Sequence, residues 1–225
     1  MELYIGNKNY SSWSMRPWLV LEHFQIPFQE RLIPLDDFQP DQAFKQTMNR
    51  VAPTAKVPTL VNGELVIWDS LAICEYLAER FPDRGLWPED QAQRANARST
   101  CAEMHSSFSQ LRSLCGMNIE ADLSDMGQQL WAEQTALRQD LARIEEIWAM
   151  RGAKAFLFDS HFTIADAFFA PVVMRIQSYQ LPVSAQAQQY CATMLQVLAV
   201  QRWMTEARQE HLFVQRQEPY RQLSQ

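Results

Sequence analysis

The sequence predicts a fold of two domains, an α/β domain on a small four-stranded sheet followed by an all-helical domain. Up to residue 82, short apolar runs bounded by turn residues alternate with helical patterns, in the order βαβ and then ββα. Beyond residue 89, apolar side chains recur at every third or fourth position, as in helices that each bury one face. Pro82 and Pro88 bracket a linker, so we expect domains over residues 1–82 and 89–225.

The first domain is predicted to contain four strands and three helices, each bounded by residues that favour its ends. Asn62-Gly63 is a strong hairpin signal between two short strands. The first helix is expected to end before Ile26-Pro27, because the residue before a proline avoids the helical region. The expected strands cover residues 3–5, 28–34, 58–61 and 64–67, and the expected helices cover residues 16–24, 40–48 and 70–80.

The second domain is predicted to be a bundle around one central helix. Residues 164–173 are apolar on nearly every side, which indicates a helix surrounded by others, with Pro171 tolerated at a bend. Thr163 and Asp166 have the spacing of a capping box at its start, so Asp166 is assigned to folding rather than to catalysis. Further amphipathic stripes run over residues 92–115, 130–148 and 191–198.

The composition argues against several classes of function. A net charge of −6 and an isoelectric point near 5.3, with no basic run, disfavour nucleic-acid binding. The chain has no Gly-rich phosphate loop, no Cys-x-x-Cys pair and no His-Glu-x-x-His pattern, so neither a nucleotide nor a metal is expected. The four cysteines are expected to be reduced and buried. No stretch reaches the ~20 apolar residues of a membrane span, and residues 1–5 do not resemble a secretory signal, so a cytoplasmic protein is expected.

Three short segments carry the functional signal. Val57-Pro58 opens a short strand, where a proline indicates an edge or tight turn that permits a cis bond and leaves the Val57 backbone free for a ligand. Asp69-Ser70 stands where a strand gives way to a helix, so its N–H groups and the Ser70 hydroxyl suit a carboxylate. Ser11-Ser12 precedes the first helix, where a hydroxyl and the helix dipole favour a thiolate. Each dipeptide alone is common in turns and caps, but their order and spacing make the set specific.

In that order and spacing the segments resemble the thioredoxin-like half of cytosolic glutathione S-transferases, and the resemblance covers nearly the whole chain. It is similar to a Ser-type, zeta- or theta-like bacterial member. The resemblance implies the glutathione transferase fold, an α/β thioredoxin-like N-terminal domain followed by an all-α helical-bundle C-terminal domain. It also implies that the Val57 backbone pairs with the cysteinyl part of glutathione, and that Asp69 and Ser70 hold its γ-glutamyl end.

A Ser hydroxyl stabilises the glutathione thiolate in these family members, and two serines qualify here. Ser12 matches the catalytic Ser of theta-like and delta-like members, whereas Ser11 matches the first Ser of the zeta-type Ser-Ser-Cys motif, so the choice stays open. Lys56 can reach the glycyl carboxylate of glutathione. His105 has two possible roles of similar weight, a structural one with its hydrogen bonds satisfied between helices and a catalytic one. The residues expected near the second substrate are Trp13, His105 and Phe108.

The expected function is glutathione conjugation, or another reaction of the glutathione thiolate with a hydrophobic electrophile, in detoxification. The protein is expected to be a cytoplasmic homodimer. One alternative is a zeta-like isomerase of maleylacetoacetate-type substrates that uses glutathione as a cofactor, although Trp13 stands where that class has Cys. Glutathione peroxidase activity is another. An alternative from a different class is a non-catalytic binding module, which the retention of Ser12, Val57 and Asp69-Ser70 disfavours. No metal, nucleic acid or membrane is expected as a partner.

Overall fold

The computed structural model describes residues 1–36 and 38–221 and has the two-domain fold that the sequence predicts. The first domain is built on a sheet of β1 (Glu2–Ile5), β2 (Gln29–Leu32), β3 (Thr59–Asn62) and β4 (Leu65–Trp68). The strand order is β2-β1-β3-β4, with β1 parallel to β2 and both other pairs antiparallel. This mixed sheet and its helices form the expected thioredoxin-like domain.

The helices of this domain in the described ranges are α1 (Ser12–His23), α2 (Ala43–Met48) and α3 (Ser70–Arg80). The bounds of α3 are those predicted. Helix α1 begins earlier than predicted, because Ser11 caps it by accepting from the Ser14 N–H. The loop between β3 and β4 is Gly63-Glu64, one residue later than predicted, and Gly63 has a φ of +63°, which glycine adopts without strain.

The second domain is all-helical and is arranged around α8, whose residues are nearly all buried. Its helices are α4 (Gln91–Ser106), α5 (Ser109–Leu114), α6 (Ser124–Glu133), α7 (Thr135–Ala149), α8 (Ile164–Tyr179), α9 (Ala185–Leu195) and α10 (Leu198–Glu210). Short 3-10 turns, η1 (Pro82–Arg84) and η2 (Gln215–Gln217), precede α4 and follow α10. All four cysteines are buried free thiols, as predicted.

Asp166 stands at the start of α8 in the predicted capping box. Its carboxylate accepts from the N–H groups of Thr163 at 2.9 Å and Leu157 at 3.0 Å, and from the Tyr190 hydroxyl at 2.9 Å. Burial raises the pKa of Asp166 to about 6, while these hydrogen bonds act in the opposite direction. The side chain therefore ties the preceding loop and α9 to the central helix.

Three predicted stripes cross helix boundaries. The stripe over residues 92–115 is divided between α4 and α5, because Phe108 takes a left-handed φ of +59° that ends the helical path. The stripe over residues 130–148 is likewise divided between α6 and α7. The stripe over residues 191–198 ends within α9, and Leu198 begins α10 with 80% of its surface exposed. Apolar spacing continues across such short breaks, so periodicity alone does not reveal them.

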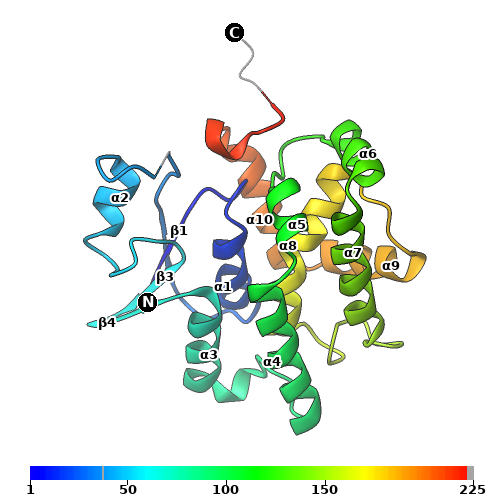
Figure 1. Ribbon diagram of the computed structural model, residues 1–225. Coiled ribbons are helices and arrows are strands. Elements are labelled where there is room, and N and C mark those ends of the chain that lie inside the picture. The colour runs from blue at the N-terminus through cyan, green and yellow to red at the C-terminus, as the bar shows by residue number, and fades with distance from the viewer. Residues whose placement is uncertain (37, 222–225) are drawn as a thin grey trace.

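The two domains pack through α1. This helix contacts β1 in its own domain and α8 and α10 in the other, and it lies between the sheet and the helical bundle (Figure 1). Helix α3 also packs on α4. The start of α1 thus lies close to both domains. Over the described ranges, no helix has the length and apolar character needed to cross a membrane.

Candidate functional site

Two adjoining hollows lie between the domains and contain nearly all the residues predicted for the site. The small hollow, of about 460 Å³, is lined by Trp13, Thr54, Lys56, Val57, Pro58, Trp68, Asp69, Ser70 and His105. The large hollow, of about 820 Å³, has Ser11, Ser12, Lys45, Arg112 and Arg175 among its lining residues. Because Trp13, Lys56 and Val57 line both hollows, the two form one continuous cleft.

The backbone at Val57 lies on the border between the two hollows. The Val57–Pro58 bond is cis, as the sequence allows. Just beyond it, the Thr59 hydroxyl donates to the Lys56 carbonyl at 2.8 Å. Within residues 1–36 and 38–221, neither the N–H nor the C=O of Val57 has a hydrogen-bond partner. A free N–H and C=O on one half-buried residue that borders a cleft can pair with a peptide in the manner of an added strand.

The start of α3 forms one end of the small hollow. Asp69 has a φ of +77°, and its Oδ1 accepts from the N–H groups of Leu71 at 2.8 Å and Ala72 at 3.3 Å. Ser70 is only 1% exposed, and its hydroxyl has no partner among the described atoms. Its N–H is also without a partner in the described part of the chain. Two unpaired donors at a helix N-terminus make this end a site for an anion.

His105 connects the second domain to the same end of the cleft. Its Nε2 lies 3.1 Å from Asp69 Oδ2, and its ring meets the Trp13 ring edge-to-face with centroids 5.0 Å apart. The Nδ1 atom is buried without a partner in the residues described. An Nε2–H group that donates to Asp69 Oδ2 fits this arrangement. His105 of the second domain thereby contacts both Asp69 and Trp13 of the first domain.

The two candidate catalytic serines differ in what their hydroxyls bind. The Ser11 hydroxyl donates to Ser14 Oγ at 2.7 Å and accepts from the Ser14 N–H at 3.4 Å. Ser14 Oγ in turn accepts from the Gly6 N–H at 3.2 Å. Ser12 is the first residue of α1, half-buried, and its hydroxyl is without a partner among the described residues. Both serines line the large hollow, but only the hydroxyl of Ser12 is free to donate.

Arg16 is a buried cation in α1, one helical turn after Ser12. Arg16 is 2% exposed, and its guanidinium stacks on Trp13 at 4.3 Å and on Phe168 at 4.7 Å. Burial, together with the charges of Arg175 and Arg112, lowers the pKa of Arg16 to about 9, so it stays charged at neutral pH. Because no acidic residue occupies the first turn of α1, the helix end keeps its positive potential.

The structure differs from the sequence-based prediction in two respects. Phe108 is buried in the core of the second domain and is not among the residues that line either hollow. The large hollow also contains Lys45, Arg112 and Arg175, which were not predicted for the site. The sequence did contain a signal for Arg175. It lies two residues beyond an apolar run predicted to be a central helix, and a charged residue continuing such a helix is one that is seldom buried without a partner.

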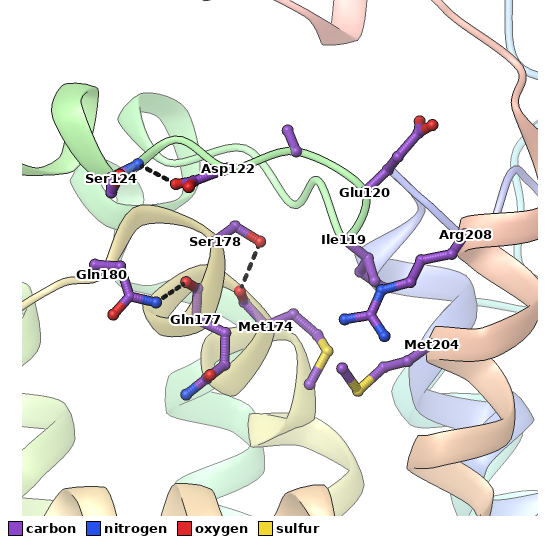
Figure 2. Close-up of a pocket in the computed structure, with 11 residues that line it drawn as sticks. Ile119, Glu120, Asp122, Ser124, Met174, Gln177, Ser178, Gln180, Met204 and Arg208 are labelled. Carbon is purple, nitrogen blue, oxygen red and sulfur yellow. Dashed lines mark hydrogen bonds between the residues drawn. The ribbon is translucent and has the colours of Figure 1, made fainter.

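A third hollow, of about 340 Å³, lies away from these residues. Figure 2 shows Met204 and Arg208 of α10 facing Met174 of α8 across it. The residues that line it come from these two helices, from Gln180 just after α8, and from residues 119–124 at and before the start of α6. None of the residues predicted for the site lines this third hollow. In the described ranges, no group of three or more His, Cys, Asp or Glu residues is placed to hold a metal ion.

Comparison with known proteins places the chain in a family. The sequence matches the glutathione S-transferase N-terminal domain over residues 10–80 and the glutathione S-transferase C-terminal domain over residues 91–206. It is 27% identical to "Glutathione S-transferase 1" of Dianthus caryophyllus over 77% of this chain and 76% of that protein. It is 30% identical to "Probable maleylacetoacetate isomerase" of Caenorhabditis elegans over 81% of each.

Among solved structures, a similar one is a glutathione transferase homolog from a Burkholderia species with bound glutathione. Its TM-score is 0.68 at 23% identity, over 93% of this chain and 98% of that one. At this level of identity the similarity concerns the fold. The two domain matches together span most of the chain. On these grounds, the chain belongs to the glutathione S-transferase family.

Proposed function

We propose that this protein is an enzyme that binds glutathione in the cleft and directs its thiolate at an electrophile. The observation that supports this most strongly is Ser70, whose buried hydroxyl has no partner among residues 1–36 and 38–221. It lies at the end of a cleft where the Val57 backbone is also unpaired in that part of the chain. Unpaired buried donors reduce stability by about 1–3 kcal/mol each, so their persistence at one place indicates a ligand that satisfies them.

The cleft offers a partner for each part of the tripeptide. The Ser70 N–H and hydroxyl suit the α-carboxylate of the γ-glutamyl residue, and Asp69 suits its ammonium group. The Val57 N–H and C=O suit the cysteinyl backbone. Lys56, exposed and bordering both hollows, suits the glycyl carboxylate. The thiol of the central residue then projects from Val57 into the large hollow, which Ser12 also lines.

Ser12 is the residue that we assign to thiolate stabilisation. A free thiol has a pKa of about 8.5 and is mostly protonated at neutral pH. A hydrogen bond donated by the Ser12 hydroxyl, the N-terminus of α1 and the buried charge of Arg16 all favour the thiolate. The proton leaves to solvent, since a serine hydroxyl is a donor here and not a base. Ser11 serves as the helix cap, because its hydroxyl is already used by Ser14.

The reaction that follows is an attack of the thiolate on a substrate held in the large hollow. Its apolar surface is provided by side chains such as Leu35, Phe38 and Met117. In conjugation, a carbon–sulfur bond forms as the leaving group departs with the bonding electrons. In the isomerase alternative, the thiolate adds to a double bond and is eliminated after rotation, so glutathione is regenerated. The similarity to the Caenorhabditis elegans protein supports this second candidate.

The experiment that tests this proposal measures thiolate formation on bound glutathione by ultraviolet difference absorbance at neutral pH. We expect the wild type and Ser11→Ala to show the thiolate signal at saturating glutathione, and Ser12→Ala to bind glutathione with the signal lost. Ser160→Ala, a change in an exposed loop, is the matched control. A signal that survives in Ser12→Ala and disappears in Ser11→Ala would reverse the assignment. No signal in the wild type would refute the enzymatic proposal.

Measurement of glutathione consumption separates the two candidate reactions. Conjugation removes one glutathione for each electrophile converted, whereas isomerisation leaves the glutathione concentration unchanged. Because both reactions need the same thiolate, Ser12→Ala is expected to lower either one by about 10²- to 10³-fold, as the loss of one preorganised hydrogen-bond donor does elsewhere.

A further inference from the structure

We propose that the second substrate of this enzyme carries a carboxylate, and that Arg112 and Arg175 bind it in the large hollow. This inference rests on the proposed function, because it concerns the electrophile that the thiolate attacks. It differs from the sequence-based expectation of an electrophile characterised only by its apolar surface.

The described residues that line the large hollow include four charged side chains, and all four are cations. They are Lys45, Lys56, Arg112 and Arg175. The chain as a whole has a net charge of −6, so this local excess of positive charge runs against the overall composition. A concave surface with charges of one sign concentrates ligands of the opposite sign.

Two described carboxylates in segments beside the hollow already accept other hydrogen bonds. Asp36 uses one carboxylate oxygen for the Phe38 N–H and the other for the Phe44 N–H, both in the segment beside the hollow. Glu218, next to η2, accepts from Tyr10, Asn118 and Arg221. Neither carboxylate is among the residues that line the hollow. The cations therefore face a space in which an anionic ligand can complete their pairing.

Arg175 has the geometry of a preorganised anion site. It extends from α8 and is only 4% exposed. Its Nε donates to the Cys115 carbonyl at 2.8 Å, and its Nη1 donates to the Pro171 carbonyl at 3.1 Å. The Nη2 group has no partner among the described residues. Two backbone contacts thus fix the guanidinium plane while one nitrogen stays available. Burial lowers the pKa of Arg175 to about 10, so the group is still charged at neutral pH.

Arg112 places a second cation close to the reacting atoms. Its Nη1 donates to the carbonyls of His105 at 3.1 Å and Ser107 at 3.2 Å, at the C-terminal end of α4. Its guanidinium lies 4.7 Å from the centre of the Trp13 ring, next to the Ser12 side of the cleft. The remaining donors of Arg112 can therefore meet a carboxylate on a substrate that reaches the thiolate. Planar guanidinium groups suit carboxylates because they bind both oxygens at once.

Glutathione does not account for all four cations. Its glycyl carboxylate is assigned to Lys56, and its other carboxylate is held by Ser70 in the small hollow. Lys45 already donates to the Ala55 carbonyl at 2.9 Å. The two arginines, which extend from α5 and α8, remain for a ligand in the large hollow. Since the same hollow has an apolar wall, the substrate class is an apolar electrophile with a carboxylate at one end.

The test compares two electrophiles that differ only in this group, 4-chloro-3-nitrobenzoate and 4-chloro-3-nitrobenzamide. In both, the thiolate forms a carbon–sulfur bond to the ring and chloride leaves with the bonding electrons. Each kcat/KM is divided by the rate constant of the uncatalysed reaction with glutathione, which removes the difference in intrinsic reactivity. We expect the corrected ratio of benzoate to benzamide to exceed about tenfold in the wild type, the size of one hydrogen bond to a charged group.

Variants at the two arginines identify the source of the preference. We expect Arg112→Gln to lower the corrected ratio to near one, and Arg112→Lys to retain part of it. Arg143→Gln, which removes an exposed cation from α7, is the matched control and should leave the ratio unchanged. Arg175→Lys keeps a positive charge at the buried position, and we expect it to lower the ratio without abolishing the reaction of the benzamide. A wild-type ratio near one, or a ratio unaffected by Arg112→Gln, would overturn the proposal.

A binding experiment without glutathione separates this proposal from the proposed function. Calorimetric titration of 4-chloro-3-nitrobenzoate into the wild-type protein should show binding that Arg112→Gln weakens by about tenfold, whereas the benzamide should bind weakly to both. If glutathione fails to bind while the benzoate binds in this manner, the anion site stands and the transferase proposal falls. If glutathione binds and both electrophiles bind alike, the anion proposal falls and the transferase proposal stands.

Discussion

Replacing Ser70 by alanine should make the protein more stable and a poorer binder of glutathione. In the free protein, the Ser70 hydroxyl is buried without a partner in the described residues. Such a group is destabilising by about 1–3 kcal/mol, because it has lost its hydrogen bonds to water and gained none. Removing it should raise the free energy of unfolding by about 1 kcal/mol or more. For a chain of this length, each kcal/mol corresponds to a rise in Tm of about 2–4 °C.

The same substitution should weaken glutathione binding. In the proposed complex, the Ser70 hydroxyl donates to the γ-glutamyl carboxylate, and a hydrogen bond to a charged group contributes about 1.5–3 kcal/mol. The dissociation constant should therefore rise by about 10- to 150-fold. The Ser70 N–H remains in the variant, so binding is weakened and not abolished. The two effects have opposite signs because the hydroxyl is unsatisfied only when the ligand is absent.

Thermal unfolding and calorimetric titration of the same samples measure both effects. Ser178→Ala is a matched control, since the Ser178 hydroxyl is also buried but donates to the carbonyls of Asn118 and Met174. That variant should lose stability, by about 1 kcal/mol, and keep its affinity for glutathione. A Ser70→Ala protein that is less stable than the wild type, or that binds glutathione equally well, would show that the hydroxyl serves the fold and not a ligand.

Three further predictions concern the pH dependence of stability, the role of Lys56 and the assembly of the chain. Because burial raises the pKa of Asp166 to about 6 from an ordinary value of 3.8, the folded state binds this proton more tightly than the unfolded state. Relative to Asp166→Asn, the wild type should therefore lose about 3 kcal/mol of unfolding free energy as the pH rises from about 4 to 6, with no further change above that, as urea titrations at several pH values will show. Lys56→Ala should weaken glutathione binding and make it less sensitive to salt, which titrations at two ionic strengths measure; equal salt dependence in both proteins would remove Lys56 from the site. Finally, the protein should sediment as a homodimer, and a monomer at every concentration would contradict this expectation.

Local signals in the sequence were sufficient for the first domain and for the central helix. Pro58, Gly63 and the Thr163–Asp166 pair each have one dominant structural use. They therefore predicted a turn, a hairpin and a helix start with small errors in position. The breaks in the helical bundle were missed for a different reason. Phe108 takes a left-handed conformation that bulky residues seldom adopt, and only the packing of the whole domain imposes it.

The candidate site shows the same difference between residues with a local sequence signal and residues that only the packing of helices brings together. Val57, Asp69 and Ser70 were predicted for this site because backbone bends and helix starts have sequence signatures, and they line the same hollow. The cationic part of the large hollow, Arg112 and Arg175, was not identified. These arginines come from separate helices of the second domain, and their proximity to the first domain depends on how α1 packs on α8. No local pattern encodes such an assembly.

The measurement that tests the central claim most directly is a comparison of glutathione with cysteinylglycine by calorimetric titration into the wild-type protein. Cysteinylglycine keeps the thiol and the glycyl carboxylate but lacks the γ-glutamyl residue that Asp69 and Ser70 are proposed to hold. The structure predicts one glutathione bound per chain, and binding of cysteinylglycine that is weaker by about 10-fold or more. Equal affinities, or the absence of binding by glutathione, would contradict the assignment of this cleft as a glutathione site.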